Sequence, residues 1–348
     1  SGALIHFGRC GSTITGMTNG AKASPPALTP GFWNGRTVVV TGGAGFLGRV
    51  VVAKLVAAGA TVHAPRSAEV DLTKAGVADK YFAQIAPSHV IHLAARVGGI
   101  GYNQIAPAPL YLDNLMMGTH VIEAARATGI EKTVLLGTVC SYPKFTPVPF
   151  NEASLWDGYP EETNAPYGIA KKAQLIHAQV NEVQYGQRFA YLIPTNLYGP
   201  GDKFHPSVSH VIPALIKKCV EAKESGAKTV EVWGTGAASR EYLYVDDAAE
   251  AIVRAAEVHD GADPINLGAA TEITIRETVE TVARLVGFDG ELVWDASKPD
   301  GQPRRCVDAS HAAEVLGWKA QMSFEQGLRN TIDWYLANRE EAERDPGK

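Results

Sequence analysis

Cysteine is scarce in this sequence, long apolar runs are missing, and neither sign of charge dominates. The 348 residues include four widely spaced cysteines that form no CxxC pair. This spacing argues against a disulfide scaffold and against a structural zinc site, so we expect no metal and a reducing, cytoplasmic setting. No apolar run approaches the roughly 18 residues that a membrane helix needs, so we expect no membrane span.

The charge balance argues against a further set of functions. With 32 basic and 37 acidic residues the net charge is −5, which argues against nucleic acid or an acidic membrane surface as a partner. Any affinity for phosphate must therefore come from a local site. Residues 1–31 are rich in Gly, Ser, Thr and Pro and do not resemble a signal peptide, so we expect a flexible arm or a remnant of cloning there.

What the sequence does contain is an alternation of short β-branched runs with helical segments. Expected strands cover residues 37–41, 61–64, 90–94, 133–136 and 188–193, and expected helices cover 46–58, 108–128 and 166–185. This alternation predicts an α/β fold, a Rossmann-type doubly wound parallel sheet with helices on both faces.

The alternation becomes irregular between residues 198 and 240 and then resumes. We expect a helix over 242–258, a strand over 264–268, a helix over 275–286, a strand over 291–294 and a last helix over 323–338. We therefore predict a dinucleotide-binding domain made of residues 32–197 plus 242–268. A smaller, discontinuous C-terminal substrate-binding lobe would consist of residues 198–241 plus 269–340.

A glycine-rich loop joins the first strand to the first helix. Its glycines allow a tight turn and a close approach of the backbone to a pyrophosphate, and the helix N-terminus adds amide donors. Because the loop lies within a complete βαβ unit, we predict that it binds a dinucleotide. The expected contacts are Gly42, Gly45, Phe46, Leu47 and Gly48.

The end of the second strand favours one cofactor over another. An NAD site would place Asp or Glu there to bind the ribose hydroxyls. This chain has Arg66 instead, which suits the 2′-phosphate of NADP(H). The alternative is that Arg66 is only solvated. Further along, Asp71 could contact the adenine or simply cap a helix.

Tyr167 and Lys171 are four residues apart, so a helix places both on one face. A nearby ammonium stabilises phenolate and makes the phenol a competent proton donor to a carbonyl oxygen during reduction. Thr138, at the end of the fourth strand, could hold that oxygen from the other side. We predict that these three residues are catalytic in a hydride transfer.

Cys140 and His210 suggest a second kind of chemistry. A lone cysteine is usually a small buried hydrophobe. A thiolate can also remove a proton from a carbon next to a carbonyl, and a histidine can return one on the opposite face. The residues alone leave both interpretations open.

Together these residues closely resemble the GDP-L-fucose synthases, bifunctional epimerase–reductases of the extended short-chain dehydrogenase/reductase superfamily. The resemblance runs from about Val38 to Trp334. Its most specific stretches are residues 94–100, 194–200, 204–213, 233–236, 240–243 and 297–301.

The resemblance implies an NADPH-dependent enzyme that converts GDP-4-keto-6-deoxy-D-mannose to GDP-L-fucose by epimerisation at carbons 3 and 5 and reduction at carbon 4. Tyr167 would be the carbonyl acid, Lys171 would bind the nicotinamide ribose, and Thr138 would replace the family's serine. Cys140 would be the epimerisation base and His210 the acid.

The resemblance also implies binding residues. Further cofactor contacts would be Leu93, Ala94, Lys171, Pro194, Asn196, Leu197 and His210. Substrate contacts would be Val139, Asn196, Lys218, Trp233, Arg240, Lys298 and Asp300. Family members tend to dimerise through a four-helix bundle, for which residues 108–128 and 166–185 match; ordinary packing against the sheet is the alternative.

Two departures from the family pattern bear on the substrate. Val139 stands where the family usually has serine, which removes a possible hydrogen bond to the sugar. Lys218 stands where arginine is common and loses bidentate geometry. The alternatives are therefore a reductase or epimerase of a related 4-keto nucleotide sugar, such as a heptose or dideoxy sugar, and a non-catalytic NADP-binding protein.

Overall fold

The computed structural model describes residues 29–98, 100–206, 208–298 and 302–344. The predicted arm therefore lies outside the described residues except for its last three positions, and so does Asp300.

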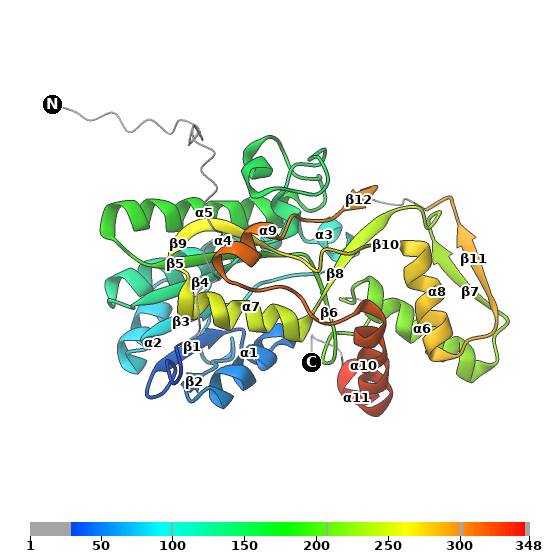
Figure 1. The fold of residues 1–348 in the computed structure, drawn as a ribbon, viewed down its shortest axis with the longest axis horizontal. Coiled ribbons are helices and arrows are strands. Elements are labelled where there is room, and N and C mark those ends of the chain that lie inside the picture. The colour runs from blue at the N-terminus through cyan, green and yellow to red at the C-terminus, as the bar shows by residue number, and fades with distance from the viewer. Residues whose placement is uncertain (1–28, 99, 207, 299–301, 345–348) are drawn as a thin grey trace, which may run out of the picture.

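A six-stranded parallel sheet forms the centre of the molecule (Figure 1). Every neighbouring pair in it is parallel, and the first three strands match the expected positions to within two residues. In spatial order the strands are β2 (Thr61–His63), β1 (Thr37–Thr41), β3 (His89–His92), β4 (Lys132–Leu136), β5 (Phe189–Pro194) and β9 (Gly261–Leu267). The strand order reverses between β1 and β3, where doubly wound sheets bind their ligands. The predicted fold class is confirmed.

Helices cover both faces of this sheet. On one face, α1 (Phe46–Ala57) packs with α7 (Val245–Val258) in a cluster of buried aliphatic residues. The other face carries α2 (Val77–Ile85), α4 (Pro107–Ala127) and α5 (Ala165–Tyr185). Short segments link these elements: α3 (Ile100–Ile105), η1 (Val139–Ser141) and η2 (Glu152–Trp156).

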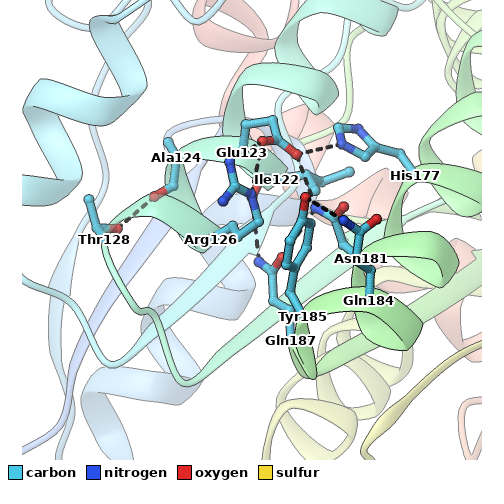
Figure 2. Close-up of polar contacts among 10 residues, drawn as sticks. All are labelled: Ile122, Glu123, Ala124, Arg126, Thr128, His177, Asn181, Gln184, Tyr185 and Gln187. Atoms are coloured by element: carbon cyan, nitrogen blue, oxygen red, sulfur yellow. Dashed lines mark hydrogen bonds and ion pairs between the residues drawn. The ribbon is translucent and has the colours of Figure 1, made fainter.

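Helices α4 and α5 pack side by side, and polar contacts around Glu123 join them in their C-terminal halves (Figure 2). Its carboxylate accepts hydrogen bonds from His177 Nε2 at 2.8 Å and Asn181 Nδ2 at 3.0 Å. Burial acts to raise the pKa of Glu123, but hydrogen bonds from Arg126 and these two residues outweigh it and lower the pKa to about 2. The carboxylate thus stays charged and ties the two helices together.

A second group of elements lies beyond the carboxyl end of the sheet, on the right in Figure 1. Strand β8 (Ser239–Tyr244) pairs with β6 (Asn196–Tyr198), β10 (Glu272–Thr274) and β12 (Arg304–Arg305), and β7 (Thr229–Trp233) pairs with β11 (Glu291–Asp295). The helices here are α6 (Val211–Ser225), α8 (Ile275–Val286) and α10 (Phe324–Ala337), which share their own buried cluster. Two short helices complete the chain, α9 (Ser310–Val315) and α11 (Arg339–Ala342).

Two sequence expectations were wrong in this part of the chain. Residues 242–244 are not helical: they end β8, where aromatic residues pair with β6, and α7 starts only at Val245 with Asp246 and Asp247 in its first turn. Residues 198–240 are not irregular, because they contain α6 and β7. The expectation rested on the His, Pro, Gly and Ser residues of this segment; one of these, Pro213, lies in the first turn of α6, where a proline costs no hydrogen bond.

None of the helices in the described part of the chain is both long enough and apolar enough to cross a membrane.

Candidate active site

The glycine loop brings the backbone of β1, α1 and β3 into close contact. Gly42 has φ of 72°, and a Cβ added there would lie 2.7 Å from the amide nitrogen of Ala94. A Cβ at Gly48 would lie 2.1 Å from the Gly42 carbonyl oxygen. Side chains are therefore excluded from this turn, which leaves a bare cradle at the start of α1, where amides lack helical partners.

Other predicted cofactor positions lie at the end of, or shortly after, strands of the central sheet. The amide of Leu93 donates to the carbonyl of Thr41 at 3.0 Å, so the chain leaving β3 runs beside the loop. Phe46 and Leu47 form the first turn of α1, while Pro194 ends β5 and Leu197 lies in β6. These positions all lie at or next to the carboxyl ends of parallel strands.

Arg66 and Asp71 follow β2. Arg66 is exposed, and within the described residues its guanidinium forms no ion pair. Its backbone amide donates to Glu69 Oε2 at 3.2 Å, which fixes the turn. The carboxylate of Asp71 accepts from the Thr73 amide at 3.0 Å and the Thr73 hydroxyl at 2.6 Å, and these bonds lower its pKa. Asp71 therefore closes its own turn and caps no helix, since α2 begins only at Val77 with Gly76 before it.

Tyr167 and Lys171 lie on one face of α5, as their spacing predicted. Lys171 is 1% exposed, and its Nζ lies 5.9 Å from the centroid of the Tyr167 ring. Burial lowers the pKa of Lys171 to about 8. Burial also raises the pKa of Tyr167, and Cys140 adds to this effect. The phenol is thus protonated at neutral pH, beside a lysine that still carries most of its charge.

Thr138 and Cys140 stand at the start of η1, against the first turn of α5. The Thr138 hydroxyl accepts a hydrogen bond from the Cys140 amide at 3.2 Å and begins this short helix. One residue on, the Ser141 hydroxyl donates to the Gly168 carbonyl at 3.0 Å. These contacts bring Thr138 and Cys140 together with Tyr167.

His210 precedes α6 and belongs to another part of the molecule. Its side chain is exposed, yet enough protein surrounds the ring to lower its pKa by burial, with a further contribution from Lys203. Among the described residues no hydrogen bond joins His210 to Cys140 or Tyr167. The structure therefore brings four of the five predicted catalytic residues together around η1 and α5, and it places His210 directly before α6.

The predicted substrate residues gather around β7 and β8. Lys218 Nζ donates to the Glu231 carbonyl at 3.2 Å, and the Lys298 ammonium lies 5.6 Å from the centroid of the Trp233 ring. Trp233 itself is 63% exposed. Arg240 donates to the carbonyls of Ser239 at 2.6 Å and Gln302 at 2.7 Å, and Asn196 donates to the Glu241 carbonyl at 2.9 Å.

Val139, a predicted substrate contact, lies in η1 next to Cys140. Its side chain is only 4% exposed and packs in a buried cluster with Tyr142, Phe150 and Leu155. The valine is thus accounted for by core packing.

Two side chains that the sequence analysis did not single out lie against the predicted catalytic residues. Arg305 Nη1 lies 3.9 Å from Cys140 Sγ. Gln174 Oε1 accepts from Lys171 Nζ at 3.4 Å. Arg305 is distant in sequence and carried no local signal. For Gln174 there was an indirect signal. Gly118 in the middle of a helix indicates that a neighbouring side chain approaches closely, and in the structure that side chain is Gln174.

Comparison with known proteins agrees with this geometry. Residues 38–268 match the NAD dependent epimerase/dehydratase family. This chain belongs to that family. Probable GDP-L-fucose synthase 1 of Oryza sativa subsp. japonica is 44% identical over 87% of this chain and 93% of its own length. That identity places the chain among the GDP-L-fucose synthases and confirms both the resemblance and the prediction of an enzyme.

Solved structures show the same fold. A GDP-L-fucose synthetase from Naegleria fowleri bound to NADP has a TM-score of 0.82 and 28% identity, covering 92% of this chain and 99% of that one. A GDP-6-OMe-4-keto-L-xylo-heptose reductase from C. jejuni also has a TM-score of 0.82 and 28% identity, covering 89% and 99%.

Proposed function

We propose that this enzyme converts GDP-4-keto-6-deoxy-D-mannose to GDP-L-fucose, inverting carbons 3 and 5 and then reducing carbon 4 with NADPH. The observation that carries the proposal is the grouping of a thiol with a reductase pair: Cys140 is close enough to Tyr167 to act on its pKa, and Lys171 lies on the same face of α5. The name of the rice relative supports the substrate.

The residues present fit NADPH. Side chains are excluded from the cradle of Gly42 and Gly48, and α1 begins at that cradle, as pyrophosphate binding requires. Arg66 is exposed at the end of the turn after β2 and would pair with the 2′-phosphate. When bound, NADPH supplies the hydride that goes to carbon 4.

The proton transfers are assigned to this chain's own side chains. In each inversion Cys140, as thiolate, takes the proton from carbon 3 or 5, and His210, as imidazolium, returns one to the opposite face; one C–H bond breaks and another forms. In the reduction Tyr167 gives its proton to the carbon 4 oxygen as the carbonyl becomes a hydroxyl. Lys171 stabilises the phenolate that is left, and Thr138 donates a hydrogen bond to the same oxygen.

Arg305 supports the role of Cys140 as a base. A thiolate is the reactive form of cysteine, and a neighbouring cation stabilises it. The guanidinium of Arg305 lies 3.9 Å from the sulfur and is held from its other side by the Gln302 side chain at 3.2 Å.

The GDP group is assigned to the smaller lobe, which consists of residues 198–241 plus 269–340. The cofactor is assigned to the other domain, which consists of residues 32–197 plus 242–268. Lys218, Arg240 and Lys298 would neutralise the diphosphate, and Trp233 offers an exposed ring for stacking. Asn196 would add an amide from the edge of the cofactor domain. Asp300 joins them by resemblance alone.

A second candidate is a reductase of a related GDP-linked 4-keto sugar. It is favoured by the likeness to the heptose reductase of C. jejuni. Val139 was the reason for this alternative in the sequence analysis. Its side chain is packed in the core, so core packing is sufficient to explain the valine and the reason is weakened. The presence of Cys140 beside Tyr167 also favours the epimerase–reductase.

The enzyme is proposed to be a cytoplasmic homodimer that pairs through α4 and α5. Both helices carry exposed apolar side chains: Leu112 at 54%, Ile176 at 40% and Val183 at 82%. Light scattering should give twice the mass of one chain for the wild type and the mass of one chain for Val183→Glu. An unchanged mass in the variant would remove these helices as the interface.

The deciding experiment is turnover of GDP-4-keto-6-deoxy-D-mannose with NADPH in deuterated water, with the product analysed by NMR. The wild type should yield GDP-L-fucose with deuterium at carbons 3 and 5. Tyr167→Phe should lower the reduction rate about 1000-fold while NADPH still binds. Cys140→Ser should block deuterium uptake. A product reduced at carbon 4 without deuterium at carbons 3 and 5 would leave the second candidate.

A further inference from the structure

Gln174 lies one helical turn after Lys171 on α5 and links the lysine to the neighbouring helix. Its Oε1 accepts from Lys171 Nζ at 3.4 Å, and its Nε2 donates to the backbone carbonyl of Asn114 on α4 at 2.6 Å. Both Gln174 and Lys171 are 1% exposed. The buried ammonium therefore has a neutral polar partner that is itself held from the other side.

The surrounding structure makes room for this amide and fixes its anchor. A Cβ added to Gly118 would lie 2.2 Å from Gln174 Cδ and Nε2, so only glycine fits at that position of α4. The Asn114 side chain accepts from the Arg96 amide at 3.0 Å and donates to the Arg96 carbonyl at 2.8 Å. A continuous line of contacts thus joins Lys171 to the segment that follows β3.

We propose that Gln174 is a positioning residue that holds the Lys171 ammonium beside Tyr167 and favours its protonated form. The inference rests on the proposed function, because it assumes that Lys171 assists Tyr167 during reduction. An amide oxygen that accepts from an ammonium stabilises the charged state, whereas an apolar side chain in its place adds only burial.

The other groups that face Lys171 leave this role open to Gln174. Tyr167 is a neutral phenol on the same helix, and the Tyr191 hydroxyl on β5 donates to the Lys171 carbonyl at 2.7 Å. Burial and the charge of Lys171 lower the pKa of His92 on β3 to about 3, so this histidine is neutral at working pH. Burial lowers the pKa of Lys171 to about 8, close to working pH, so any change in the groups around its ammonium changes the charged fraction directly.

The test is a titration of the Lys171 side chain by NMR of protein carrying ¹³Cε-labelled lysine, with the signal assigned by its loss in Lys171→Met. The wild type should titrate near pH 8. Gln174→Leu, which keeps the volume and removes the acceptor, should move the midpoint down by about one pH unit. Gln174→Glu, which restores an acceptor, should return the midpoint to the wild-type value or above it.

A matched control separates positioning from helix packing. His177→Ala removes a tie between α4 and α5 at the outer end of the pair and leaves Lys171 untouched (Figure 2). It should lower the melting temperature without moving the midpoint. If Gln174→Leu fails to fold, Gly118→Ala takes its place, because the added methyl displaces the amide and should move the midpoint in the same direction.

Activity gives a second readout. Since Lys171 acts as the ammonium, the alkaline limb of the pH profile of kcat/KM should move to lower pH in Gln174→Leu, and kcat at pH 8 should fall about 5-fold, as the protonated fraction does. A Lys171 midpoint equal in wild type and Gln174→Leu, or shifted equally by His177→Ala, would overturn the proposal. The titration needs no GDP sugar, so a failure of the proposed function would appear separately, as an absence of turnover.

Discussion

The cofactor side and the substrate side of this enzyme are built in opposite ways. The proposed cofactor cradle is made of backbone: Gly42 and Gly48 lie so close to neighbouring main chain that an added Cβ would fall within 2.7 Å of it. The proposed GDP site is made of long side chains. Lys218, Trp233 and Lys298 are all exposed, and Lys218 is held by a neutral carbonyl oxygen.

This difference implies different kinds of recognition. A backbone cradle is rigid before the ligand arrives, so a substitution there changes the shape of the site. An exposed ammonium that donates to a neutral carbonyl can exchange this hydrogen bond for one to a diphosphate. The exchange is favourable, because the charge-assisted bond to the diphosphate is about twice as strong as the bond to the carbonyl. We therefore expect steep effects in the cradle and graded effects around β7 and β8.

The steepest effect is expected at Gly48. In Gly48→Ala the new Cβ would meet the Gly42 carbonyl oxygen at 2.1 Å, so the turn has to move. We expect NADPH affinity, measured by the fluorescence of the bound nicotinamide, to fall about 100-fold or more. Gly261→Ala on β9 is the matched control, because its Cβ approaches nothing closer than 3.5 Å. Equal affinity in the two variants would show that the cradle is not rigid.

The same contrast explains what could be predicted from the sequence. The glycine loop, the first three strands and the Tyr167–Lys171 pair depend on local spacing, and the structure places all of them where the pattern indicated. Asp71 was left undecided, because a capping carboxylate and a ligand contact have the same local pattern; its bonds to Thr73 close a turn ahead of α2 rather than cap a helix.

What the sequence could not predict depends on contacts between distant segments. Arg305 reaches Cys140 only because β12 pairs with β8, and no spacing rule links positions so far apart. Residues 198–240 were misjudged because His, Pro, Gly and Ser residues interrupt the apolar pattern there, although the segment contains α6 and β7. Val139 was assigned to the substrate by the family resemblance, and the burial of its side chain is a property of the packed core that no local pattern indicates.

A smaller effect is expected at Arg66, where the cofactor site depends on a side chain rather than on backbone. Arg66→Ala should weaken NADPH binding about 30-fold, through loss of a charge-assisted contact, and should leave NADH binding unchanged. Titration of both cofactors against wild type and variant measures the ratio, with NADH as the internal control. A similar loss of affinity for NADPH and NADH would mean that the Arg66 side chain shapes the turn after β2, to which its backbone bond to Glu69 also contributes. That result would remove the basis for choosing NADPH.

The smallest effect is expected at Lys218. Lys218→Met should raise KM for the GDP sugar about 5-fold and leave kcat and the melting temperature nearly unchanged, because an exposed lysine bound to a carbonyl adds little stability. Lys223→Met is the matched control on the same helix: its Nζ donates to the Val286 carbonyl at 2.8 Å, away from the proposed site. Lys218→Arg should lower KM below the wild-type value, since a guanidinium can grip a phosphate with two bonds. The contrary outcome is a strong fall in kcat for Lys218→Met. The GDP site would then be as rigid as the cofactor site, and the two sides of the enzyme would not differ in the way proposed.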